Sequence, residues 1–112
     1  MMDSLDLMKR VRDALLSKKA ADIVVFDVRE TSPVTDYYVI ASGATAAQLK
    51  AMSNSVNQTL KEAGQPNARS SGVPDDGWLV LDLFDVVIHI FQDEIRSYYS
   101  IEELWEECPR VQ

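Results

Sequence analysis

The feature that most constrains the fold is the stretch WLVLDLFDVVIHIF, residues 78 to 91, which holds two short and almost wholly apolar runs, 78–83 and 86–91. Short runs of this kind predict β-strands. Only Phe84 and Asp85 separate the segments, so they are predicted to form a hairpin with a two-residue loop. One face of that hairpin is wholly apolar, with Leu83 opposite Val86, Leu81 opposite Ile88 and Leu79 opposite Ile90. This face has to be buried, so the rest of the chain must supply a layer that covers it.

The opposite face of the hairpin is chemically mixed, because it carries large aromatic rings together with an acid and the chain's single histidine. The predicted cross-strand pairs are Trp78 with Phe91, Val80 with His89, and Asp82 with Val87. Aromatic anchors beside polar groups are typical of protein interfaces. The alternative is that a helix covers this face and that His89 is a hydrogen-bonded core residue. The sequence leaves both interpretations open.

The N-terminal half of the chain alternates helical and strand patterns. Apolar residues at helical spacing predict an amphipathic helix over residues 4–18, which Asp3 can cap. Residues 21–28 and 36–43 are rich in β-branched and aromatic residues and predict two strands. The link between these strands is short, so they are expected to be antiparallel neighbours.

Two capping boxes in the rest of the sequence mark the expected starts of two more helices. Thr45 with Gln48 opens a second helix, and Gly64 is expected to end it in the left-handed conformation. A weak edge strand is expected near residues 67–71. A box formed by Ser100 and Glu103 predicts a last short helix, and the tail after it is expected to fray.

These patterns describe one domain over residues 1–112, with a core from about 4 to 106. The predicted order is helix, two strands, helix, weak strand, two strands, helix. That order belongs to the α/β (α+β) class, with a mixed sheet of four to five strands and helices packed on it.

The net charge indicates which class of partner the protein can bind, and the cysteine content indicates the cellular compartment in which it works. The net charge of -7 argues against nucleic acid as the main partner, because phosphate contacts need Lys and Arg. It favours a partner with a basic surface. The single cysteine, Cys108, cannot form an internal disulfide, and neither a signal peptide nor a membrane span is evident. A cytoplasmic protein is expected.

His89 is a weak candidate for catalysis or metal binding. A zinc site needs three or four ligands, and His89 has only Asp82 and Asp85 in its neighbourhood of the sequence. There is no G-x-S-x-G nucleophile turn and no glycine-rich phosphate loop. We therefore predict no catalytic residue, metal or cofactor.

Five blocks of the sequence carry a resemblance to a known family. They are ADIVVFDV, TDYYVIASG, LKEAG, GWLVLDLFDVVIHIF and RSYYSIEELW, at residues 21–28, 35–43, 60–64, 77–91 and 96–105. In order and spacing they resemble the Iojap proteins, also called ribosomal silencing factors. The similarity runs from about residue 5 to residue 106.

The resemblance implies a small nucleotidyltransferase-like domain that acts without catalysis. Family members bind the large ribosomal subunit at ribosomal protein fourteen, block joining of the small subunit and so repress translation. Organelle relatives assist large-subunit assembly, and several members form homodimers. The family's motif falls here on the predicted partner-binding residues, which are Trp78, Asp82, Asp85, His89 and Tyr99.

The sequence also departs from the family pattern. Phe84 stands where the family has a turn glycine, which implies a different turn or a longer loop. Nucleotidyltransferase chemistry requires a Gly-Ser motif and paired carboxylates that hold metal ions. Here the order is Ser42-Gly43 and no D-x-D follows, so nucleotide transfer is predicted to be absent. A large-subunit assembly factor and a nucleotide-binding enzyme remain the alternative functions.

Overall fold

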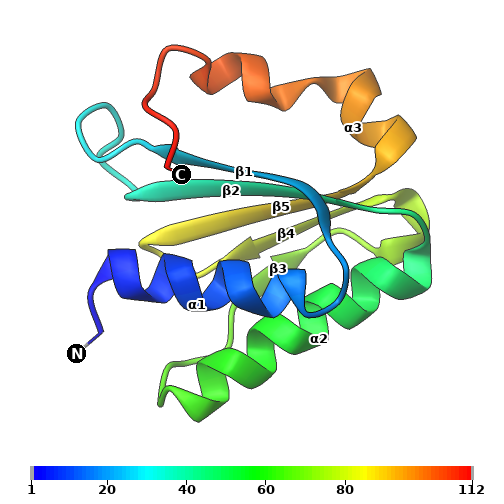
Figure 1. Cartoon of the computed structure of the whole chain (residues 1–112), viewed down its shortest axis with the longest axis horizontal. Helices are drawn as coiled ribbons and strands as arrows, with labels where there is room; N and C mark the ends of the chain where they lie inside the picture. The colour runs from blue at the N-terminus through cyan, green and yellow to red at the C-terminus, as the bar shows by residue number, and fades with distance from the viewer. Residues whose placement is uncertain (1, 112) are drawn as a thin grey trace.

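The computed structural model describes residues 2–111 and forms a five-stranded mixed sheet in the order β1-β2-β5-β4-β3 (Figure 1). The strands are β1 (Ala21–Asp27), β2 (Tyr37–Gly43), β3 (Arg69–Ser71), β4 (Trp78–Asp82) and β5 (Val86–Gln92). Strands β2 and β5 are parallel, and the other neighbours are antiparallel. The expected antiparallel pairing of the first two strands and the weak edge strand are both confirmed.

The hairpin of β4 and β5 has the predicted register. Leu81 pairs with Ile88, Val80 with His89 and Trp78 with Phe91. The Leu83 amide donates to the Val86 carbonyl at 2.9 Å, so the loop holds only two residues. Of the two outcomes expected from Phe84, a different turn or a longer loop, the longer loop is absent, and Phe84 adopts a positive φ of 70°. The Asp85 amide also donates to the Leu83 carbonyl at 3.0 Å, which tightens the turn around Phe84.

Two helices, α1 (Ser4–Leu16) and α2 (Ala46–Glu62), cover one face of the sheet (Figure 1). This is the layer that the apolar hairpin face requires. Both start where the sequence predicts, because Asp3 accepts from the Asp6 amide and Thr45 from the Gln48 amide. Gly64 follows α2 at a φ of 71°, as expected. The buried contacts in this layer involve Leu7, Met8, Val11, Leu15, Leu49, Met52, Val56, Leu60, Leu79, Leu81, Val86, Ile88 and Ile90.

The other face of the sheet is only partly covered, by α3 (Asp93–Tyr99), the 3₁₀ helix η2 (Ile101–Trp105) and the tail (Figure 1). A second, smaller core lies there around Phe26, Val28, Ile40 and Phe91, all of which are buried.

One prediction about the C-terminal region is confirmed in part and another is wrong. Ser100 directly precedes the last short helix, η2, as predicted, but its side chain makes no capping hydrogen bond there. Ser100 also ends α3 in the left-handed conformation, with φ 46°, and its hydroxyl donates to the Ser97 carbonyl. The tail does not fray over the described residues. The Asp27 amide donates to Pro109 at 2.8 Å and the Val111 amide donates to Val25 at 2.9 Å, so the tail lies along the free edge of β1. Gln112 lies outside the described residues.

Candidate functional site

A continuous row of rings crosses the partly covered face of the sheet. Tyr99 lies 4.8 Å from Trp78 between ring centroids, Trp78 lies 6.0 Å from His89, and His89 lies 6.0 Å from Trp105. Trp105 stacks on Tyr38 at 4.1 Å. We call these five residues the aromatic row. Each ring comes from a different element, so the row exists only in the folded chain. The elements are β2, β4, β5, α3 and η2.

His89 occupies the centre of the row as a neutral imidazole. The indole Nε1–H of Trp78 donates to its Nδ1 at 3.1 Å. An indole N–H can only donate, so Nδ1 must be an acceptor and the proton of the neutral ring is on Nε2. Burial lowers the pKa of His89 from 6.5 to about 4, because the charged ring would lose its hydration.

The Nε2–H of His89 is available to a partner. Within residues 2–111, no acceptor lies within hydrogen-bond distance of this group. The hydroxyl of Thr35 is the only buried side-chain polar atom in that range without a hydrogen-bond partner. The unpartnered Nε2 atom is therefore not fully buried and reaches solvent. His89 is thus hydrogen-bonded within a partly covered face, as one of the two interpretations expected, and the interface interpretation of this face stays a prediction.

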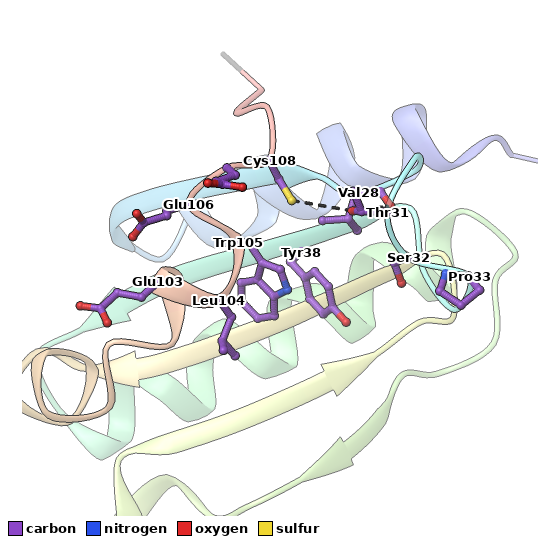
Figure 2. Close-up of a pocket in the computed structure, with 11 residues that line it drawn as sticks. Val28, Thr31, Ser32, Pro33, Tyr38, Glu103, Leu104, Trp105, Glu106 and Cys108 are labelled. Carbon is purple, nitrogen blue, oxygen red and sulfur yellow. Dashed lines mark hydrogen bonds between the residues drawn. The ribbon is translucent and has the colours of Figure 1, made fainter.

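The surface is hollowed at both ends of the row. At one end, a pocket of about 450 Å³ is lined by Trp78, Val80 and Tyr99, with Asp76 and the β3 residue Ser71 beside them. At the other end, a groove of about 820 Å³ lies between η2 and the loop after β1, with Tyr38 and Trp105 in its lining (Figure 2). Pockets with aromatic walls at an otherwise polar surface can hold the anchor side chains of a partner.

Two of the predicted site residues lie apart from the row. Asp82 is four residues from Trp78 on β4, about 13 Å along the strand. Its carboxylate accepts from the Phe84 amide at 2.8 Å, so it stabilises the hairpin turn. Asp85 is exposed in the turn, and its carbonyl accepts from the amides of Asp36 and Tyr37. The structure therefore brings Trp78, His89 and Tyr99 together and places the two acids at the far end of the hairpin.

The sequence prediction missed two members of the row, Tyr38 and Trp105. Successive side chains of a strand point to opposite faces of the sheet. Tyr37 is buried under the α1 and α2 layer, so its neighbour Tyr38 lies on the other face. What brings it near His89 is the parallel pairing of β2 with β5, in which Ile40 lies opposite His89. That pairing joins segments about fifty residues apart, and no local pattern encodes it. Trp105 lies in the last short helix, and its ring packs on the sheet while it remains partly exposed.

The corner where β2 meets α2, at Ser42 and Gly43, is occupied by the protein's own side chains. Arg96 donates to the buried Ser42 hydroxyl at 2.6 Å and to the Glu102 carboxylate at 2.6 Å. At Gly43, an added Cβ would lie 2.8 Å from the Leu49 side chain. Ser42 is thus committed to a structural contact.

Two broader searches of residues 2–111 gave negative findings. No group of three or more His, Cys, Asp or Glu side chains there is arranged to hold a metal ion. None of the helices in this part of the chain has the length and apolar character needed to cross a membrane.

Comparisons with known proteins agree with this architecture. The family model described as "Ribosomal silencing factor during starvation" matches residues 1–112. The ribosomal silencing factor RsfS of Zymomonas mobilis is 35% identical over 99 residues, which cover 88% of this chain and 74% of that protein. The mouse protein named "Mitochondrial assembly of ribosomal large subunit protein 1" is 35% identical over 94 residues, covering 81% of this chain and 41% of the mouse protein.

A solved structure shows the same fold. The crystal structure of a Chromobacterium violaceum protein superposes with a TM-score of 0.87 at 34% sequence identity, covering 93% of this chain and 87% of that one. Because the family model spans the whole chain and the sequence and structural similarities cover most of it, the chain belongs to the ribosomal silencing factor family.

Proposed function

We propose that this protein docks on the large ribosomal subunit, at ribosomal protein fourteen, and sterically prevents the small subunit from joining. Translation would be repressed without any cofactor or chemical step. The observation that carries the proposal is the aromatic row, which remains partly exposed on the surface of an acidic chain of this family.

The row has the chemistry of a docking face. The pocket between Trp78 and Tyr99 can take an anchor side chain, and the exposed fraction of Tyr99 is 54%. The Nε2–H of His89 supplies a directional donor in the middle of the face. Asp82 and Asp85 carry negative charge at one end of the same hairpin, which suits a basic ribosomal protein and would mainly raise the association rate. A standard interface of about 800 Å² per partner is enough for stable binding.

Binding and joining can be measured separately on purified subunits. We expect Tyr99→Ala to weaken co-sedimentation with large subunits at least tenfold, as expected for an interface hot spot. Asp85→Lys should mainly slow association. The matched control is Asp13→Lys on the exposed side of α1, which makes the same charge change on the opposite face of the molecule. Unchanged co-sedimentation for both test variants would refute this docking face.

Loss of binding must also restore subunit joining. A variant that no longer binds large subunits, yet still prevents small subunits from joining them, would contradict steric occlusion. A variant that binds normally but permits joining would place the blocking surface elsewhere on the protein.

A second candidate function is assembly of the large subunit, favoured by the name of the mouse relative. In that case the protein acts on immature particles. Ribosome profiles after depletion of the protein distinguish the two roles. Accumulated large-subunit precursors favour assembly, whereas normal particles with increased joining favour silencing.

We further propose that the protein works in the cytoplasm, forms a homodimer and is not an enzyme. The names of its relatives describe regulation or assembly, and the Ser42 corner is taken up by Arg96. Calorimetric titration with nucleotides and Mg²⁺ tests the last point, since saturable binding would contradict it. Sedimentation analysis of the purified chain tests the dimer.

A further inference from the structure

We propose that the groove beside Trp105 is a binding site for an arginine side chain of a basic polypeptide partner. The groove is lined by Val28, Thr31, Ser32, Pro33, Tyr38, Cys108 and residues 103–107. It lies at the opposite end of the aromatic row from the Trp78 pocket. The inference rests on the proposed function only for the source of the arginine, a basic protein of the large subunit.

The aromatic wall of the groove suits a planar cation. Trp105 and Tyr38 stack with an angle of 18° between their rings. Figure 2 shows these two rings side by side at the centre of the groove. A guanidinium group is planar and weakly hydrated, so it packs on aromatic faces more readily than an ammonium group.

The charged rim of the groove is complementary to that cation. Glu103, Glu106 and Glu107 are exposed, and within residues 2–111 their side-chain carboxylates form no ion pair or hydrogen bond. Glu103 and Glu106 lie on one side of the aromatic pair, and the loop with Ser32 and Pro33 lies on the other (Figure 2). Carboxylates can accept both N–H groups of a guanidinium fork, which an ammonium cannot match.

The chain's own nearby cations do not fill this site. Arg29 is paired with Asp27 at 2.7 Å. Arg110 lies over the Phe26 ring at 5.3 Å. Both guanidinium groups therefore have partners outside the stacked pair of Trp105 and Tyr38, and the proposed cation comes from another molecule.

The walls of the groove are held in place before any ligand binds. The loop after β1 is closed by hydrogen bonds from the Thr31 and Ser32 amides to the Val28 carbonyl, at 3.1 and 2.8 Å. The Thr31 hydroxyl also lies 3.7 Å from the Cys108 sulfur (Figure 2). A preformed site loses less entropy on binding than one that has to be ordered.

The chain's two tryptophans allow the site to be located directly, because one lies on each side of His89 in the row and each borders a different pocket. The probe is a blocked hexa-arginine peptide, added to the full chain and followed through the two indole N–H signals in NMR spectra. We expect saturable movement of the Trp105 signal and little movement of the Trp78 signal. Hexa-citrulline, which has the same shape without charge, should cause no shift, and hexa-lysine should bind more weakly.

Matched charge variants separate the groove from general attraction. The variant E103Q/E106Q/E107Q should weaken binding of the arginine peptide about tenfold. The control D6N/D13N/E62Q removes the same charge from the helical layer on the other side of the sheet and should bind nearly as well as the parent.

Four results would overturn the site. They are equal weakening by the two triple variants, binding of the citrulline peptide, a shift confined to Trp78, or movement of the Trp105 signal with protein concentration alone. The last result would assign the groove to a second copy of this chain. The peptide titration contains no ribosome, so it tests the groove alone. Failure of peptide binding would overturn the groove, whereas unchanged ribosome docking by Tyr99→Ala would count against the proposed function.

Discussion

His89 should make this protein less stable as the pH falls. Burial sets its pKa at about 4 in the folded chain, compared with 6.5 for the exposed group. Between these values the unfolded chain binds a proton that the folded chain excludes, so stability falls as the pH falls. Above pH 7 the contribution is flat. The folded state should lose about 2.5 kcal/mol by pH 4.5 and about 3 kcal/mol below pH 4.

His89→Asn is the variant that isolates this effect. The Asn oxygen can accept from the Trp78 indole as Nδ1 does at 3.1 Å, but it does not titrate. Urea unfolding at pH 7 and pH 4.5 should show that the parent chain loses about 2.5 kcal/mol more than the variant does. Carboxylates titrate in both proteins, so their contribution cancels in the difference.

Direct titration of the imidazole gives an independent measurement. The chain has a single histidine, so its ring signals in NMR spectra need no assignment. The reasoning is refuted if the ring titrates near 6.5, or if His89→Asn loses as much stability on acidification as the parent chain.

Two further predictions concern the hairpin turn at Phe84 and the hydrogen bonds that Arg96 of α3 donates to Ser42 and Glu102. Phe84→Gly should be about 1 kcal/mol more stable than Phe84→Ala, because both lack the ring and only Gly adopts the φ of 70° without strain; equal stability would show that the turn relaxes. Arg96→Lys should cost about 1.5–3 kcal/mol, because an ammonium cannot hold Ser42 and Glu102 in the same forked geometry. Denaturant unfolding measures both, and Arg10→Lys on the exposed side of α1 should stay within about 0.5 kcal/mol. A loss that small at Arg96 would contradict its anchoring role.

The sequence predicted the features that local chemistry controls. The register of the hairpin followed from taking Phe84 and Asp85 as the loop, which puts Leu79 and Leu81 on the apolar face and Asp82 on the other; a slip of one residue would have reversed the faces. The starts of α1 and α2 followed from side chains that reach an amide three residues away. These interactions lie within a few residues, so they can be identified without knowing the fold.

The errors lie where tertiary contacts outweigh local preference. Ser100 and Glu103 have the spacing of a capping box, yet the chain reverses at Ser100. Arg96 draws Glu102 back to within 2.6 Å, and Trp105 packs on Tyr38. Beyond Trp105, backbone hydrogen bonds with Val25 and Asp27 hold the tail on β1. For the candidate site, the sequence predicted Trp78, His89 and Tyr99. It did not predict Tyr38, whose place beside His89 depends on the pairing of β2 with β5.

The edges of the sheet explain why a partner should bind the face rather than add a strand. The free edge of β1 is satisfied by the tail, through the bridge between Phe26 and Arg110. The opposite edge is β3, which has only three residues, all exposed. Short or covered edges are poor templates for another strand. The face that carries the aromatic row instead offers aromatic rings together with the Nε2–H donor of His89. Docking there leaves the α1 and α2 layer free, so a bound partner and that layer lie on opposite sides of the sheet.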